Sequence, residues 1–336
     1  MIGGPIGDII GAIYEGRKAL FNDSGLIVGY VKNNQETYFK QPQGLIHDDA
    51  SFSDDAVLAL ATASSCVRAH SYEDEYLRFF TMFSEPNQWY LGTAGLGYGA
   101  MFLEWAIRDP GEPRVPYGSY GNGSGMRVPA IGWSNDSLVG VLNEARASAL
   151  CTHNHPAGIK GAQAIAMAIW LARNAVSPEE IAHAVTAEFG YTFDFELEHL
   201  RRNYVFNATC SGSVPQAIWL ALQGPDFETV MRNCLYIGGD TDTIACMAGS
   251  IAEPLYGIPP SILERCYQII ERDGPFLLDT FERFAGRYLP HYCNENGELL
   301  RITARPQEYR RLTLPNWVRK LWPKTSPQKD ASGSRP

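Results

Sequence analysis

The amino-acid sequence predicts an all-α protein built as a single compact helical domain. Several long segments repeat apolar residues at helical spacing, and most begin with a capping residue. Alternating polar and apolar residues, which are typical of strands, are scarce. Because the strongest helical segments follow one another without strands between them, a parallel α/β sheet is not expected. Hydrophobic residues make up 45% of the 336 residues, which is enough for a substantial core.

The first strong helical segment, SDDAVLALATASSCVRA, spans 53–69. Ser53 is a favoured capping residue, and Val57, Leu60 and Ala61 share one face. The stretch GAQAIAMAIWLARNA, 161–175, is apolar or small almost all round, which predicts a buried central helix.

The next segment, SPEEIAHAVTAEF, begins with Ser177 and Glu180 at the spacing of a capping box. The stretch SVPQAIWLALQGPD predicts a helix that starts near Ser213 and Pro215 and ends at Gly224.

The last strong helix follows GGDTDT. Its apolar stripe consists of Ile244, Met247, Ala248 and Ile251. We expect Pro254 to limit this helix.

We expect one all-α domain over residues 1–290, without an internal linker or repeat. Residues 291–322 are expected to form a C-terminal appendage packed on this domain. The tail at 323–336, PKTSPQKDASGSRP, is polar and rich in Pro and Ser, so we expect it to be disordered.

Composition and charge disfavour several classes of protein. The net charge is −9 and no long basic block occurs, so a nucleic-acid groove is disfavoured. The seven cysteines are odd in number and scattered, and no signal peptide is recognisable, which predicts a cytoplasmic protein with reduced thiols. No apolar run is long enough to span a membrane.

Two acidic clusters stand at predicted helix starts: Ser53-Asp54-Asp55 and Asp240-Thr241-Asp242-Thr243. Each alone could be an ordinary helix cap. Together they offer more carboxylates than capping needs, and each adds a hydroxyl. Hard divalent cations prefer such oxygen ligands, so two facing clusters would suit a pair of these ions.

A third acidic candidate is Glu15 in GDIIGAIYEG. Asp8 and Glu15 are seven residues apart, which predicts that they share one helix face. Gly7 and Gly11 on that segment are more simply explained by close helix packing. Glu15, at the end of an apolar stretch, is harder to explain by packing.

The loop YGSYGNGSGMRVPAIGW is rich in glycine and could bind phosphate through its free backbone N–H groups, although a plain flexible loop is an equal alternative. Further on, His153 and His155 precede the central helix. They lack the partners of a zinc site, so we expect hydrogen bonds to a ligand or to the backbone.

Taken in order, these motifs resemble the ADP-ribosylglycohydrolase family, which includes the dinitrogenase-reductase-activating glycohydrolases. The matching pieces are GDIIGAIYEG, FSDDAVLALA, GNGSGMRV, THNHPAGIKGA, SVPQAIWLAL and GGDTDTIACMAGSIAEPLYGIP. The resemblance implies an orthogonal all-α fold with a binuclear Mg²⁺ or Mn²⁺ site in a central cleft. It also implies an enzyme that removes ADP-ribose from a modified acceptor, foremost a mono-ADP-ribosylated protein.

The resemblance assigns residues by motif. The implied metal ligands are Ser53, Asp54, Asp55, Asp240, Asp242 and Thr243. The implied substrate-binding residues are Gly121, Asn122, Gly123, Ser124, Met126 and His153. Glu15 and Asp55 are our candidates for orienting water and moving protons. In this mechanism, the metals would lower the pKa of a water molecule and direct it at C1″ of the ribose, and the transition state would be oxocarbenium-like.

The chain departs from the family pattern in two places. It reads Ser-Asp-Asp-Ala at 53–56, where family members commonly have Thr-Asp-Asp-Thr. Serine keeps the hydroxyl, so metal binding should survive. Glu253 stands where small residues are frequent, and the sequence gives no account of it.

Two alternatives stay open. One is a non-catalytic relative that only binds ADP-ribose. The other is a haloacid-dehalogenase-type phosphatase, in which Asp240 of Asp-x-Asp-x-Thr would be the nucleophile. The phosphatase hypothesis requires a strand before Asp240 and a parallel sheet. The acceptor linkage, the choice between Mg²⁺ and Mn²⁺, and the oligomeric state stay undetermined, with a monomer expected.

Overall fold

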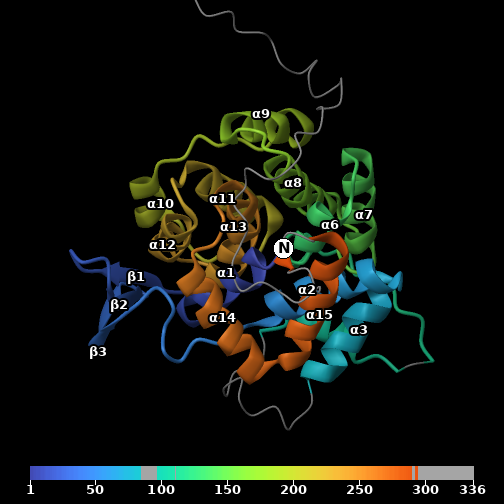
Figure 1. Cartoon of the computed structure of the whole chain (residues 1–336), viewed down its shortest axis with the longest axis horizontal. Helices are drawn as coiled ribbons and strands as arrows, with labels where there is room; N and C mark the ends of the chain where they lie inside the picture. Colours follow the sequence, from blue (N-terminus) through green and yellow to red (C-terminus); the bar gives the residue numbers. More distant parts are fainter. Residues whose placement is uncertain (85–96, 110, 290–291, 294–336) are drawn as a thin grey trace, which may run out of the picture.

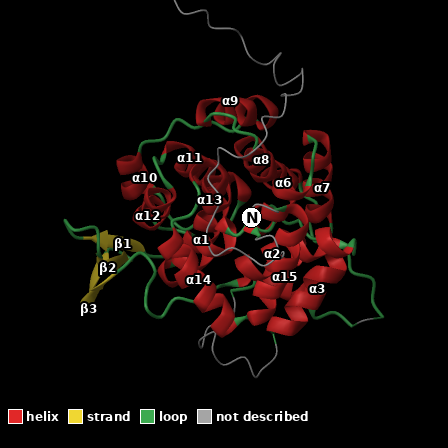
Figure 2. Cartoon of the chain, viewed as in Figure 1, coloured by secondary structure: helices red, strands yellow, loops and turns green. Residues whose placement is uncertain are grey.

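The computed structural model describes residues 1–84, 97–109, 111–289 and 292–293. Helices form nearly all of the body, so the prediction of an all-α fold is confirmed (Figure 2). The helices are α1 (Gly3–Gly11), α2 (Asp54–Arg68), α3 (Tyr72–Phe83), α4 (Ala100–Ala106), α5 (Gly123–Met126), α6 (Pro129–Ser134), α7 (Leu138–Leu150), α8 (Pro156–Arg173), α9 (Pro178–Phe189), α10 (Leu197–Asn203), α11 (Cys210–Gln223), α12 (Phe227–Ile237), α13 (Thr241–Tyr256), α14 (Pro260–Asp273) and α15 (Pro275–Tyr288).

A small sheet, which the sequence analysis did not predict, lies at one edge of the helical body (Figure 1). Its strands β1 (Lys18–Phe21), β2 (Ile27–Lys32) and β3 (Gln35–Gln43) are antiparallel and follow chain order. It follows a short 3₁₀ turn, η1 (Ala12–Tyr14). The phosphatase arrangement needs a parallel sheet with a strand leading to Asp240. Because this sheet is antiparallel, and α12 rather than a strand precedes Asp240, the described fold does not provide it.

The core contains the apolar helices that the sequence singled out. α8 is buried along most of its length, from Gly158 to Ala172, as a central helix should be. α13 is buried from Thr241 to Pro254 and packs against α1, α11 and α12. These two helices form the scaffold on which the loops and helix ends of one cavity are held.

Most predicted helix boundaries hold, with differences at prolines. Ser53 caps α2, and Ser177 forms a complete capping box with Glu180 at the start of α9. However, α11 begins at Cys210 with Thr209 as its cap, so Pro215 lies inside the helix. Pro254 also lies inside α13, which continues to Tyr256. Pro215 is the sixth residue of α11 and lies past the first turn, so it removes one internal hydrogen bond, the one to the Ser211 carbonyl.

Glu253 now has a structural explanation. Its carboxylate accepts hydrogen bonds from the Gly3 backbone N–H at 2.8 Å and from the Tyr292 hydroxyl at 2.6 Å. It therefore joins α13 to the start of α1 and to the chain beyond α15. Nearly all of the predicted appendage at 291–322, and the whole tail at 323–336, lie outside the described residues.

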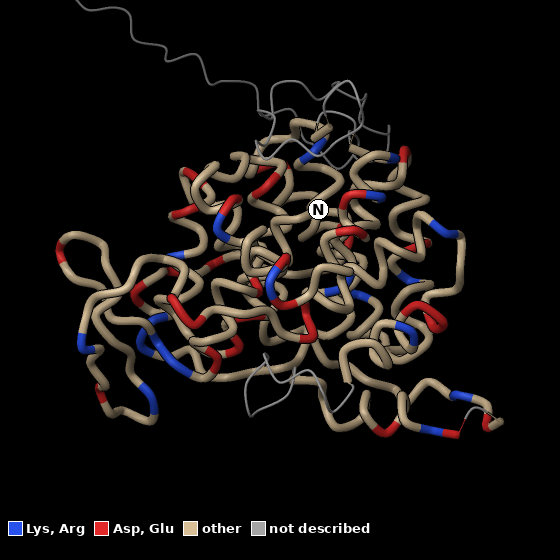
Figure 3. Tube along the Cα trace, turned by 60° about the horizontal axis from the view of Figure 1, so that its bottom comes forward, with Lys and Arg blue, Asp and Glu red and all other residues tan. Residues whose placement is uncertain are grey.

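Charged residues of both signs are interspersed along the chain trace (Figure 3). This distribution agrees with the absence of a long basic block in the sequence. Within the described part of the chain, every helix is too short or too polar to cross a membrane.

Candidate functional site

Two helix N-termini, those of α2 and α13, supply the acidic residues of the site. The Ser53 Oγ accepts a hydrogen bond from the Asp55 N–H at 3.2 Å, so Ser53 is both cap and neighbour of the carboxylates. Asp54 and Asp55 follow in the first turn and are buried. Asp240 precedes the first residue of α13 without capping it, and Asp242 lies in its first turn. Most of these carboxylates are therefore not used as helix caps.

The close crossing of α1 and α13 brings a further carboxylate to the site. A Cβ atom added at Gly7 would lie 2.0 Å from the Ala245 carbonyl oxygen, so only glycine fits at this crossing. The same holds at Gly11, where a Cβ would lie 2.4 Å from the Thr241 carbonyl oxygen. This contact carries Asp8 next to Asp242. The prediction of close helix packing at these glycines is confirmed.

Asp8 connects α1 to the start of α2. Its carboxylate accepts hydrogen bonds from the Ser53 backbone N–H at 2.8 Å, the Ser53 hydroxyl at 2.7 Å and the Ala56 N–H at 3.0 Å. Asp8, rather than any residue of α2, thus accepts hydrogen bonds from the backbone N–H groups that lack a partner at the start of that helix. The sequence analysis named Asp8 but gave it no place in the site.

The carboxylates gather in two groups. Asp8, Asp55 and Asp242 each place an oxygen within 4.8 Å of the others, and so do Glu15, Asp240 and Asp242. Asp242 belongs to both groups. The Oδ1 atoms of Asp55 and Asp242 are buried without a hydrogen-bond partner in the described structure. Buried carboxylate oxygens rarely stay unpaired, so this donor set fits hard divalent cations.

Electrostatics supports the same conclusion. Burial raises the pKa of Asp8 to about 6 and the pKa values of Asp54, Asp55 and Asp242 well above their ordinary range. Neighbouring carboxylates raise these pKa values further, because like charges disfavour ionisation. A bound cation would relieve this repulsion and favour the ionised forms.

Glu15 lies differently from the prediction. α1 ends at Gly11, and the η1 turn separates it from Glu15, so Asp8 and Glu15 do not share a helix face. Glu15 is exposed at the mouth of the cavity. Partial burial, followed by the charge of Asp240, raises the pKa of its carboxyl. Because the helix ends before Glu15, this side chain can lie near Asp240 and Asp242.

The glycine-rich loop reaches the acidic residues and is held in place by backbone and side-chain hydrogen bonds. Gly121 pairs with Thr209 in an isolated β-bridge, and the Asn122 N–H donates to the Ala208 carbonyl at 2.9 Å. The Asn122 side chain donates to the Asp240 carboxylate at 2.7 Å. The loop is therefore connected directly to the acidic end of the cavity.

Of the predicted substrate-binding residues, all but one line this cavity. Ser124 is the exception, since its buried hydroxyl donates to the Gly158 carbonyl at 2.7 Å. The lining residues of the predicted set are Gly121, Asn122, Gly123, Met126 and His153. Among the implied metal ligands, Ser53 is not part of the cavity lining, but its hydroxyl hydrogen-bonds to the carboxylates of Asp8 and Asp55. The other implied ligands line the cavity.

The two histidines have separate roles. His153 is only 6% exposed and lines the cavity, with its Nδ1 2.8 Å from the Thr152 hydroxyl oxygen. His155 is exposed and caps α8, accepting a hydrogen bond from the Ala157 N–H at 3.1 Å. The expected backbone hydrogen bond is therefore found at His155.

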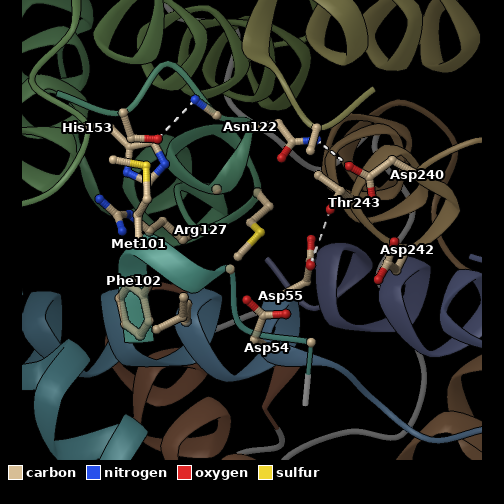
Figure 4. A pocket seen from close by; sticks show the side chains of 18 of the residues that line it. Asp54, Asp55, Met101, Phe102, Asn122, Arg127, His153, Asp240, Asp242 and Thr243 are labelled. Carbon is tan, nitrogen blue, oxygen red and sulfur yellow. Dashed lines mark hydrogen bonds between the residues drawn. The ribbon is translucent and has the colours of Figure 1, made fainter. Parts of the chain in front are cut away.

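The cavity has a volume of about 350 Å³ and two chemically different ends (Figure 4). The aspartates and Thr243 gather at one end, and His153 and Arg127 lie at the other. Met101, Phe102 and Phe206 supply apolar wall. Arg127 and these apolar residues were not predicted, because the spacing of motifs in the sequence does not show which side chains line a common cavity.

Comparisons with known proteins show the family and support the fold. Residues 1–297 match the sequence profile of the ADP-ribosylglycohydrolase family. The curated protein ADP-ribosylhydrolase ARH3 is 28% identical in both Bos taurus and Homo sapiens, and each alignment covers 81% of this chain and 89% of the relative. A solved structure titled "ADP-ribosylglycohydrolase-related protein complex" superposes with a TM-score of 0.55 and 22% identity, covering 84% of this chain and 95% of that one. This last similarity supports the fold alone.

Proposed function

Because the chain belongs to the ADP-ribosylglycohydrolase family, we propose that it is a hydrolase that removes ADP-ribose from a modified acceptor. The acceptor class that we propose is mono-ADP-ribosylated protein, and the bond is the glycosidic bond at C1″ of the ribose. The observation that carries this proposal is one cavity that has unpaired carboxylates at one end, His153 and Arg127 at the other, and a glycine-rich loop along its wall.

Divalent cations, Mg²⁺ or Mn²⁺, are part of the proposal. The side chains that would hold them are Ser53, Asp54, Asp55, Asp240, Asp242 and Thr243, and the placement of Asp8 supports adding it to this set. When bound, such cations polarise sugar hydroxyls and lower the pKa of water. The unpaired Oδ1 atoms of Asp55 and Asp242 are the best evidence for this role.

The protein's own residues would divide the work as follows. Backbone N–H groups of the loop at Gly121–Gly123 would bind the diphosphate. Asn122 holds Asp240 in place by the hydrogen bond between their side chains. Glu15 and Asp55 are the proposed proton-transfer groups. Glu15 suits this role because its raised pKa brings its titration nearer to neutral pH.

Release of free ADP-ribose tests the proposal. The purified protein is incubated with substrates carrying ADP-ribose on arginine or on serine, in Mg²⁺, in Mn²⁺ or in chelator. We expect cation-dependent release from one of the two substrates, which would also identify the linkage. Binding of ADP-ribose without release from either substrate would instead favour a non-catalytic relative. Release that persists fully in chelator would contradict the proposed metal chemistry.

A further inference from the structure

Thr152 lies between a buried arginine and the cavity histidine. Its hydroxyl oxygen is 2.7 Å from Arg127 Nη2 and 2.8 Å from His153 Nδ1. Arg127 and Thr152 are both fully buried, and His153 is nearly so. The three side chains thus form one hydrogen-bonded chain that leads from the interior to the cavity wall.

The direction of these hydrogen bonds follows from which groups carry protons. A guanidinium has only donors, so the Thr152 oxygen must accept from Arg127. The single hydroxyl proton of Thr152 is then available for a second partner. His153 Nδ1 is close enough to accept a hydrogen bond from it, whereas the Cys151 Sγ lies 4.0 Å away. The Tyr117 hydroxyl also interacts with Thr152 and can donate to the second lone pair of the Thr152 oxygen. When Nδ1 of a neutral imidazole accepts a hydrogen bond, the ring carries its single proton on Nε2.

Arg127 is held firmly enough to set this direction. Its Nη2 also donates to the Ser148 carbonyl at 2.7 Å, near the end of α7. Its guanidinium carbon lies 4.3 Å from the centre of the Tyr76 ring, a cation–π contact. Within the described residues Arg127 has no carboxylate within ion-pair distance. The positive charge of the Arg127 guanidinium, next to His153, is therefore not neutralised by a carboxylate of the described residues.

The far side of the imidazole faces the glycine-rich loop. A Cβ atom added at Gly123 would lie 3.3 Å from Nε2, and one added at Gly121 would lie 3.5 Å from it. The missing side chains leave room beside Nε2. In the described structure Nε2 has no hydrogen-bond partner of its own. An acceptor oxygen in the cavity can therefore reach it.

We propose that Arg127 and Thr152 are positioning residues that fix the proton of His153 on Nε2, so that Nε2 donates to an anionic oxygen of the substrate. Burial, and then the charge of Arg127, hold the pKa of His153 well below its usual value, which keeps the ring neutral. Only the identity of the anion, the diphosphate of ADP-ribose, rests on the proposed function.

The tautomer can be measured without any substrate. Two-dimensional ¹H–¹⁵N spectra of the histidine side chains distinguish protonated from unprotonated ring nitrogens, and a His153→Gln variant identifies the resonances. We expect Nε2–H in the wild-type protein. Thr152→Val, which keeps the side-chain shape, should give a mixture of tautomers or Nδ1–H. Thr280→Val, which removes a buried hydroxyl on α15, is the control and should leave His153 unchanged.

Binding provides the second measurement. Thr152→Val should weaken ADP-ribose binding by about tenfold and leave adenosine binding unchanged, because only the former has the diphosphate. Nδ1–H in the wild-type protein, or an unchanged tautomer in Thr152→Val, would overturn the proposal. If the tautomers behave as expected but ADP-ribose does not bind, the positioning chain stands and the proposed function fails.

Discussion

At the scale of single residues, the acidic end of the cavity combines strong burial with incomplete hydrogen bonding. Asp8 is fully satisfied by the start of α2, whereas Asp55 and Asp242 each keep one buried oxygen unpaired. Removing water from a carboxylate favours its protonated form unless a positive partner is present. The stability of the protein without divalent cations should therefore depend on pH.

The first prediction concerns that dependence. The pKa of Asp8 is about 6 in the folded protein and 3.8 as its ordinary value, so the folded state binds the proton more tightly. Stability is then greatest below pH 4 and is lost as pH rises through 6, by on the order of 3 kcal/mol for this group. Asp54, Asp55 and Asp242 should continue the loss at higher pH.

Urea unfolding between about pH 4 and pH 8 measures this loss, because the contribution of Asp8 changes between its ordinary and its folded pKa. The free energy of unfolding of chelator-treated protein should fall with pH, and added Mn²⁺ should reduce the fall. Asp242→Asn should make it shallower, because one buried carboxylate is removed. A stability that is flat or rising over this range in chelator would show that the carboxylates are not arranged as described.

The second prediction concerns Asn122. Its side chain donates to Asp240 at 2.7 Å and connects the glycine-rich loop to the acidic end. Removing a hydrogen-bond partner of a metal ligand commonly weakens metal affinity by about 10- to 100-fold. We expect Asn122→Ala to lower Mn²⁺ affinity by this amount, as measured by titration calorimetry. Asn203→Ala removes an exposed amide on α10 and should have no effect.

At the scale of secondary-structure elements, the local sequence was sufficient to predict the main helices. Ser53 and Ser177 could be identified as caps because their hydroxyls bond to nearby N–H groups. The sheet was missed because its strands bury few side chains: β1 buries only Ala19, β2 buries only Ile27 and Gly29, and β3 is exposed at most positions. The predicted start of α11 and the predicted end of α13 were wrong. In the sequence, the prolines inside these helices look like residues that begin or end a helix.

The crossing of α1 over α13 leads to the third prediction. Gly7→Ala would push a methyl group into the Ala245 carbonyl, so the helices must separate. We expect a loss of about 1–3 kcal/mol in the free energy of unfolding and weaker Mn²⁺ binding, since Asp8 moves with α1. Gly286 on α15 has nothing within 4 Å of an added Cβ.

Gly286→Ala is therefore the matched control for this substitution. It should stabilise the protein slightly, by about 0.5–1 kcal/mol, because alanine favours helix. Equal effects of the two substitutions in thermal or urea unfolding would contradict the close crossing.

At the scale of the whole molecule, the cavity joins segments that are far apart in the chain. Its walls come from Glu15, the start of α2, α4, the glycine-rich loop, His153 and the start of α13. The motifs predicted most of these segments as parts of one site. They could not predict Asp8, Arg127 or Thr152 as participants, since each acts through a contact that only the folded chain creates.

The fourth prediction tests the central claim that this two-ended cavity hydrolyses ADP-ribose linkages. The measurement is the initial rate of ADP-ribose release in Mn²⁺ by wild type, Asp242→Asn and Asp279→Asn, using the substrate that the wild type cleaves. Asp242 belongs to both carboxylate groups, whereas Asp279 forms a surface ion pair on α15.

We expect the rate of Asp242→Asn to fall by at least about a hundredfold and that of Asp279→Asn to match the wild type. Both variants should unfold cooperatively, which excludes a loss of folding as the cause. A folded Asp242→Asn protein that releases ADP-ribose at the wild-type rate would contradict the account.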